Sequence, residues 1–165
     1  PTSSVSAIDI YIDGCDQVDQ DLNALKSGGG IHTHEKILAT MAKEFIIAGD
    51  EGKFVIEFDS RFPVVIDILP DALNFIRSKL ELLYPEVKCT LRLSDKKDGS
   101  VITENGNYLI DIWFKEWPPL SQINPMLKSI PGVVETSLFY NLAHKAILAG
   151  KNGVRILENS RLMKQ

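Results

Sequence analysis

Apolar and polar positions in the first third of the chain follow two different periods. Isoleucine recurs at every second position over 8–12 and predicts a strand that ends at Asp13. After a polar turn at 14–21, apolar side chains at helical spacing predict a helix over 32–44, and the apolar run 45–48 predicts a second strand. Strand, glycine loop, helix and strand in this order are typical of the βαβ unit of a parallel sheet, so we expect an α/β fold.

The pattern changes near Phe62-Pro63. The expected elements beyond this point are strands at 64–69, 87–93, 101–102 and 108–114 and helices at 70–83 and 120–130. Pro131-Gly132 ends the second helix. Helices and strands in this succession predict a small α+β unit of ferredoxin-like type.

The final segment is apolar again from 138 to 148, and the last strand is expected at 154–157. Residues 141–149 have helical propensity, but a buried strand fits the same apolar run. The sequence leaves both alternatives open.

Composition limits the classes of function. With 165 residues, the chain is long enough for one domain or two small ones, and 44% apolar and 24% charged residues are typical of soluble globular proteins. A net charge of −4 argues against general binding to a nucleic-acid backbone, and no apolar run has the roughly 20 residues that a membrane span needs. Cys15 and Cys89 lie far apart, which predicts free thiols and a cytoplasmic location.

Two carboxylates follow the first predicted strand. Asp13 comes directly after it, at the edge where open α/β sheets bind ligands, and Asp16 lies one tight turn later. We expect both to point into one cleft. The alternative is that Asp13-Gly14 is an ordinary turn sequence.

A lysine and a glycine run come next. Backbone N–H groups of three glycines at 28–30 can surround an anion, and Lys26 beside them can stabilise an oxyanion or bind a phosphate. The run matches neither a Walker loop nor GxGxxG. Lys53, after the second strand, can reach the same crevice. The alternative for both lysines is a solvated surface position.

The first turn of the predicted helix offers a base. Glu35 there can interact with the helix dipole, or can accept a proton if partial burial raises its pKa. His32 and His34 lie two residues apart, so a helix points them to different faces. With no third histidine or cysteine nearby, we expect no metal site.

Five blocks of the sequence together resemble ribose-5-phosphate isomerases of the type A family, and the resemblance runs from residue 8 to 157. The blocks are Asp13-Gly14-Cys15-Asp16, Lys26-Ser27-Gly28-Gly29, Glu35-Lys36, Thr103-Glu104-Asn105-Gly106-Asn107 and Ile130-Pro131-Gly132-Val133-Val134-Glu135. The resemblance implies a Rossmann-like domain, at 1–62 and 139–165, with a ferredoxin-like α+β domain inserted at 63–138.

The resemblance also implies an activity and its residues. The reaction is the interconversion of ribose 5-phosphate and ribulose 5-phosphate in the pentose phosphate pathway, through an enediol(ate), without metal or organic cofactor and in a homodimer or tetramer. Glu35 would move the proton between C1 and C2, Lys26 would stabilise the enediolate oxygen, and the aspartates would hold hydroxyls and assist ring opening. The implied substrate-binding set is Asp13, Gly14, Cys15, Asp16, Lys26, Ser27, Gly28, Gly29 and Lys53.

The sequence departs from the family in two ways. Cys15, Gln17 and Ser27 stand where the family usually has alanine, glutamate and glycine. The family's N-terminal segment, with its Gly-Thr-Gly-Ser-Thr phosphate loop, has no counterpart before Pro1. We therefore expect a part of a longer polypeptide, weak substrate binding without that segment, and an exposed apolar sheet edge.

A sugar-phosphate-sensing module of the same fold, as in some bacterial sugar-operon repressors, is the competing hypothesis. Such repressors carry a basic helix-turn-helix ahead of this fold, and the sequence shows none. The combination of Glu35 and Lys26 with Asp13 and Asp16 favours catalysis.

Overall fold

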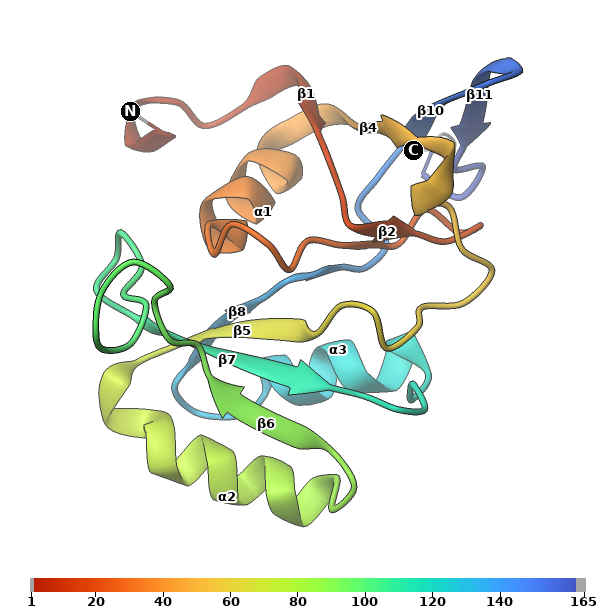
Figure 1. The fold of residues 1–165 in the computed structure, drawn as a ribbon. Helices are drawn as coiled ribbons and strands as arrows, with labels where there is room; N and C mark the ends of the chain where they lie inside the picture. Colours follow the sequence, from red (N-terminus) through yellow and green to blue (C-terminus); the bar gives the residue numbers. More distant parts are fainter. Residues whose placement is uncertain (1, 163–165) are drawn as a thin grey trace. The chain divides into compact units, whose positions relative to one another are not determined.

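The computed structural model describes residues 2–162, which form two compact units (Figure 1). Unit 1 comprises residues 2–26, 34–58 and 139–162, and unit 2 comprises residues 27–33 and 59–138. The chain leaves unit 1 twice, after Lys26 and after Phe58, and returns to it each time.

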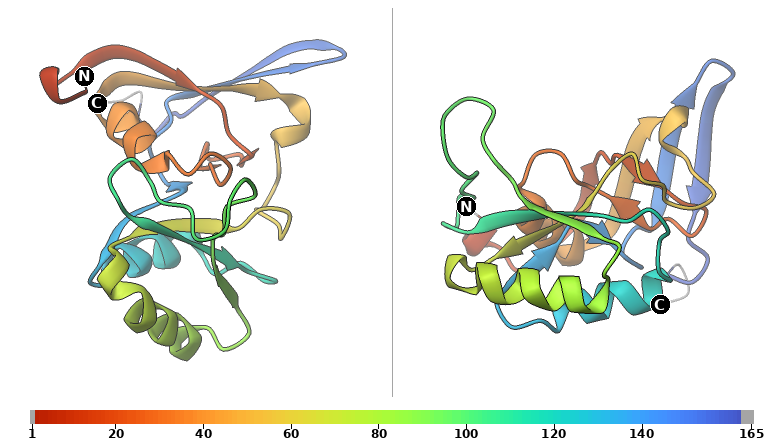
Figure 2. Two further views of the ribbon diagram at one scale, coloured as in Figure 1. Left: turned by 60° about the vertical axis from the view of Figure 1, so that its left-hand side comes forward. Right: turned by 60° about the horizontal axis from the view of Figure 1, so that its bottom comes forward.

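Unit 1 is built on a four-stranded sheet in the order β1-β4-β10-β11. Its strands are β1 (Ile8–Asp13), β4 (Ala42–Asp50), β10 (Lys145–Gly150) and β11 (Gly153–Glu158). β1, β4 and β10 run parallel, whereas β10 and β11 form an antiparallel hairpin. Helix α1 (His32–Met41) precedes β4 and covers one face of the sheet (Figure 2). The parallel βαβ unit that the sequence predicts is confirmed.

The side chains of β1 alternate between the two faces of this sheet, as the period of a strand requires. Register sets Tyr11 opposite Phe45, and the two rings stack with centroids 5.5 Å apart in the core of unit 1. Ile10 and Ile12 point to the other face and are exposed. β1 is an edge strand of the sheet, so the exposed apolar side chains expected there are present.

The boundary between α1 and β4 differs from the prediction. The helix ends at Met41, not at residue 44, and β4 already begins at Ala42. Residues 43 and 44 are part of the strand because β4 pairs along the length of β1, and their polar side chains form ion pairs with neighbouring strands. Lys43 pairs with Asp9 at 2.7 Å on the exposed surface. Strand pairing thus overrides local helix propensity.

The open alternative at residues 141–149 is resolved in favour of a strand. β10 pairs with β4 on one side and β11 on the other, and its Ala146 and Leu148 are buried. Alternate burial is the pattern of a strand. The strand expected at 154–157 is confirmed as part of β11.

Short elements complete the connections of unit 1. They are the 3-10 helices η1 (Thr2–Ser4) and η2 (Glu51–Lys53) and the strands β2 (Gln17–Val18), β3 (Ala24–Leu25) and β9 (Leu138–Phe139). The prediction of a simple polar turn over 14–21 is wrong in part, because β2 lies within it and pairs antiparallel with β3. Gln17 and Val18 are both buried. The polar residues around them gave no sign that this hairpin packs against the core.

Unit 2 is an antiparallel sheet in the order β6-β7-β5-β8 with two helices on one face (Figure 2). In chain order the elements are β5 (Val64–Ile68), η3 (Pro70–Ala72), α2 (Leu73–Leu83), β6 (Lys88–Leu91), β7 (Tyr108–Trp113), α3 (Leu120–Lys128) and β8 (Val133–Thr136). The helices are amphipathic and bury Ile76 and Leu80 of α2 and Ile123 and Leu127 of α3.

In unit 2, one predicted strand is wrong and one strand was not predicted. The strand expected at 101–102 is only a single bridge, from Ile102 to Tyr108. The sequence did not predict β8, where the apolar pair Val133 and Val134 is too short to reveal a strand by its period. These residues form a strand because their backbone pairs antiparallel with β5 at the edge of the sheet.

The loop of residues 27–33, which contains the glycine run, is held by unit 2. Arg92 donates to the carbonyl oxygens of Ser27 and Gly28, at 2.8 and 3.0 Å, and is itself paired with Asp111 at 2.6 Å. Gly30 has a φ of +71°, and a Cβ there would lie 2.7 Å from a methyl carbon of Leu109. Glycine is therefore required at this position.

No helix among residues 2–162 is both long and apolar enough to span a bilayer.

Replacing Arg92 by lysine tests whether its planar guanidinium fixes this loop. Arg92→Lys keeps the charge but loses the fork that serves both carbonyls and Asp111. We expect faster amide hydrogen exchange at residues 28–31 and a loss of about 1–3 kcal/mol in the free energy of unfolding. The control is Arg61→Lys, in an exposed pair with Asp59, where about 0–1 kcal/mol is expected. Unchanged exchange in the loop would show that Arg92 does not hold it.

Candidate active site

Asp13, Lys26 and Glu35 meet inside unit 1. They come from the end of β1, from the residue after β3 and from the first turn of α1. The Nζ atom of Lys26 lies 3.0 Å from Oδ2 of Asp13 and 3.5 Å from Oε2 of Glu35. One ammonium group is thus shared by two carboxylates.

Lys26 is the most enclosed member of this cluster. Its side chain is only 7% exposed, so the alternative of a solvated surface lysine is wrong. Besides the carboxylates, its ammonium donates to the carbonyl oxygen of Gly14 at 2.6 Å and lies 5.7 Å from the centre of the Phe139 ring. A buried charge needs such partners, and they also fix where it points.

The Asp13 carboxylate is held by three donors. The backbone N–H of Gly14 donates to Oδ1 at 2.7 Å, while the hydroxyl of Tyr11 donates to Oδ2 at 2.6 Å. Lys26 also lies against Oδ2. The carboxylate is therefore oriented without any ligand.

Glu35 has the electrostatic environment of a proton acceptor. Burial raises its pKa above the ordinary glutamate value, the ammonium of Lys26 opposes that rise, and the negative charge of Asp13 adds to it. A carboxylate with a raised pKa can take a proton and return it near neutral pH. This fits the base that the sequence predicts, although the same residue also sits where a helix dipole favours an acid.

The other predicted residues of unit 1 lie around this cluster. Cys15 is buried, which raises the pKa of its thiol to about 11 and keeps it protonated near neutral pH. The half-buried Asp16 and the ammonium of Lys53 both act on this thiol, so both groups lie close to it. Lys53 follows β4, is partly exposed and lies 3.9 Å from Asp50. No ion pair in the described part of the chain joins it to the lysine-centred cluster.

Ser27, Gly28 and Gly29 belong to the loop held by Arg92. The Ser27 hydroxyl donates to the carbonyl oxygen of Pro63 and is therefore engaged within unit 2. Along the chain, the loop directly follows Lys26 and leads into α1.

Sequence reasoning missed two contacts of the cluster. Tyr11 lies two residues before Asp13 on the same strand, so the period of β1 places both side chains on one face. That signal was in the sequence. Phe139 is fully buried, and both Lys26 and Lys36 lie over its ring. The long separation along the chain gave no signal for this contact.

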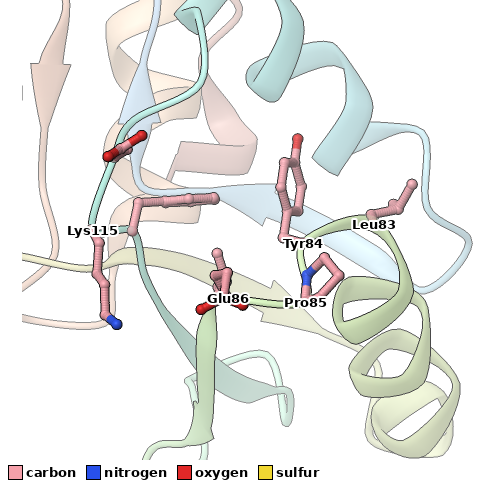
Figure 3. Close-up of a pocket in the computed structure, with 8 residues that line it drawn as sticks. Leu83, Tyr84, Pro85, Glu86 and Lys115 are labelled. Atoms are coloured by element: carbon pink, nitrogen blue, oxygen red, sulfur yellow. The ribbon is translucent and has the colours of Figure 1, made fainter.

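One cavity of the structure lies away from the predicted site residues. A cavity of about 420 Å³ in unit 2 is lined mainly by the segment after α2 and by residues after β7 (Figure 3). None of the predicted site residues lines it. Among residues 2–162, no group of three or more histidine, cysteine or acidic side chains is arranged to hold a metal ion.

The free energy of unfolding of Glu35→Gln distinguishes two roles of Glu35: a carboxylate with a raised pKa, suited to act as a base, and an acid that interacts favourably with the helix dipole. A glutamate whose pKa is raised on folding costs stability when it is ionised, because the folded state binds the proton more tightly than the unfolded chain. Glu35→Gln should therefore be more stable than the unsubstituted chain above the raised pKa. This difference should disappear as the pH falls through that pKa towards 4.5, the ordinary value.

Urea unfolding between pH 4 and 8 measures the difference. If the helix dipole were the main partner of Glu35, the variant would be less stable at pH 7 than the unsubstituted chain. That outcome would contradict a raised pKa of Glu35, on which its proposed role as a base depends.

Several known proteins with similar sequences are named ribose-5-phosphate isomerase A. The family model for ribose 5-phosphate isomerase A (phosphoriboisomerase A) matches residues 1–153. Ribose-5-phosphate isomerase A of Thermosynechococcus vestitus is 40% identical over 147 residues, which are 89% of this chain and 61% of that protein. The protein of the same name from Pyrococcus furiosus is 40% identical over 154 residues, 93% of this chain and 66% of that protein. The chain thus spans 61–66% of the length of these relatives.

Solved structures agree. Ribose 5-phosphate isomerase A from Methanocaldococcus jannaschii is similar with a TM-score of 0.85 and 35% identity, over 92% of this chain and 66% of that one. A D-ribose-5-phosphate isomerase in complex with phospho-erythronic acid gives a TM-score of 0.88 and 38% identity, over 94% and 67% of the two chains. The mixed α/β fold with a parallel sheet is shared with them. This chain belongs to the ribose 5-phosphate isomerase A family.

Proposed function

We propose that this chain carries the catalytic groups of an aldose–ketose isomerase that interconverts D-ribose 5-phosphate and D-ribulose 5-phosphate. One observation supports this most strongly: the buried ammonium of Lys26 is shared between Asp13 and Glu35. The family's name supplies the substrate, and a relative solved with phospho-erythronic acid supports a site for phosphorylated sugar acids and their analogues.

The reaction needs a base and a positive charge close together. A proton next to a carbonyl is weakly acidic, and removing it from C2 of the open-chain aldose pushes an electron pair onto the carbonyl oxygen at C1. Glu35 takes that proton and returns it to C1, while the hydroxyl proton on O2 moves to O1. Lys26 lowers the barrier because its charge stabilises the oxygen that becomes anionic. A raised pKa suits Glu35 to both proton transfers.

The remaining residues have proposed roles around this step. Asp13 and Asp16 hold sugar hydroxyls and assist ring opening, and the backbone N–H groups of Gly28 and Gly29 assist Lys26. Lys53 contacts the substrate as a partly exposed cation. Gly14, Cys15 and Ser27 contribute backbone or packing contacts, since the thiol stays protonated near neutral pH and the hydroxyl is already engaged. No metal or organic cofactor takes part in this scheme.

We also propose two domains, whose bounds differ from those of the two units mainly at residues 27–33, which belong to unit 2. Residues 1–62 and 139–165 form a Rossmann-like catalytic domain, which the parallel β1-β4-β10 order supports. Residues 63–138 form an inserted ferredoxin-like domain, and the succession βαββαβ with sheet order β6-β7-β5-β8 supports it. As the family resemblance implies, we also propose a cytoplasmic homodimer or tetramer acting in the pentose phosphate pathway.

A coupled assay for ribulose 5-phosphate formation tests the activity. It is run on this chain and on the chain joined to the N-terminal segment of the Pyrococcus furiosus relative. We expect turnover in the joined protein and a fall in kcat of at least about a hundredfold in Glu35→Gln, because proton transfer by a positioned base contributes on that order.

The Pyrococcus furiosus protein is the positive control, and Asp98→Asn, far along the chain in an exposed turn, is the matched carboxylate control. Full activity of Glu35→Gln would contradict the proposed base. Binding of ribose 5-phosphate without turnover in the joined protein would instead indicate a sensing module.

A further inference from the structure

The Tyr11 hydroxyl makes a contact that the proposed reaction has not used. It donates a hydrogen bond of 2.6 Å to Oδ2 of Asp13, the same oxygen that lies 3.0 Å from the ammonium of Lys26. Two donors therefore share one carboxylate oxygen, whose two lone pairs can accept from both. The other oxygen, Oδ1, is occupied by the backbone N–H of Gly14.

We propose that Tyr11 is a positioning residue: its hydroxyl anchors the Asp13 carboxylate so that Lys26 remains shared with Glu35. The proposal rests on the isomerase function proposed above. Tyr11 acts through Asp13 and Lys26 and touches no reacting atom in this scheme.

Packing fixes the phenol independently of any substrate. The ring of Tyr11 stacks on Phe45 with an interplanar angle of 25°, and Phe45 is fully buried and contacts Phe139 in turn. Lys26 lies over that Phe139 ring. A single row of aromatic rings thus supports both the donor to Asp13 and the ammonium, which keeps their relative geometry constant.

The shared oxygen explains why the hydroxyl matters. A hydrogen bond from a neutral donor stabilises part of the negative charge of a carboxylate, so removing that donor strengthens the attraction of the carboxylate for a nearby ammonium. Without the hydroxyl, Asp13 would draw the Lys26 ammonium towards itself, since 3.0 Å is already shorter than the 3.5 Å to Glu35. The Lys26 ammonium would then lie farther from Glu35, and the positive charge that stabilises the enediolate oxygen in the proposed reaction would be displaced.

Tyr11 serves as a neutral donor and not as a second base. Burial and the nearby Asp13 carboxylate both raise the pKa of its phenol. The hydroxyl therefore keeps its proton throughout the neutral range. Its hydrogen bond to Asp13 is present whenever that carboxylate is ionised.

The charged groups near Glu35 determine how its pKa should change when the Tyr11 hydroxyl is removed. Lys26 lies after β3 and Asp13 at the end of β1, and Tyr11 of the same strand feels the charge of Glu35 as well. Lys36, the neighbour of Glu35 on α1, lies 5.0 Å from the centre of the Phe139 ring. If Lys26 moves towards Asp13 and away from Glu35, the pKa of Glu35 rises, because the opposing effect of Lys26 weakens.

Tyr11→Phe tests this inference because it removes only the oxygen and keeps the ring on Phe45. The pKa of Glu35 is measured by carbon-13 NMR of its carboxyl group, which needs no turnover. We expect that pKa to rise in Tyr11→Phe. In the joined isomerase, we expect kcat to fall on the order of tenfold with little change in KM, and the acid limb of the pH profile to move to higher pH.

Two controls make the result specific. Tyr84→Phe removes a hydroxyl in unit 2, where the ring contacts Phe114, and should change neither the pKa of Glu35 nor kcat. In an Asp13→Asn background, adding Tyr11→Phe should no longer move the pKa of Glu35, because the anchored carboxylate is absent.

An unchanged pKa of Glu35 in folded Tyr11→Phe would overturn the inference, and so would an equal shift with and without the Asp13 carboxylate. Loss of stability without a change in that pKa would make Tyr11 a packing residue and also contradict it. If the joined protein has no isomerase activity, the proposed function fails, but the NMR titration still decides the role of Tyr11.

Discussion

The buried ammonium of Lys26 is the constraint on which the arrangement of unit 1 depends. The side chain of Lys26 is only 7% exposed. Burying its ammonium without hydrogen-bonding or ion-pair partners would cost several kcal/mol. Its partners come from different parts of the chain: Asp13 and Gly14 at the end of β1, and Glu35 at the start of α1. Each of these elements must therefore be placed correctly for the cluster to form.

The parallel sheet supplies that placement. The register of β1 on β4 sets Tyr11 against Phe45 and brings Asp13 to the end of the strand. A shift of one residue would turn both side chains to the opposite face. Burial raises the pKa of Glu35, the ammonium of Lys26 opposes that rise, and the second carboxylate, Asp13, adds to it. The fold thus encloses one carboxylate beside another, which is the environment that the proposed base requires.

Local pattern was sufficient to predict the βαβ unit and both long helices of unit 2, whereas the family resemblance was needed to single out Asp13, Lys26 and Glu35 together. Local pattern missed a strand, or left two alternatives open, where distant pairing decides the structure. The alanine-rich segment of β10 is a strand only because β4 and β11 flank it, and Val133–Thr136 is a strand only because β5 is beside it. The contact of Phe139 with Lys26 and that of Arg92 with the loop of residues 27–33 could not be predicted, because each joins residues far apart in the sequence.

The pKa of Glu35 in Lys26→Met, measured by carbon-13 NMR against the unsubstituted chain, tests most directly whether one ammonium serves both carboxylates. Lys26 lies within 3.5 Å of Glu35 and opposes the effects that raise its pKa. If the ammonium is shared, its removal raises the pKa of Glu35 further above that of the unsubstituted chain. An unchanged or lower pKa in the folded variant would contradict the shared ammonium.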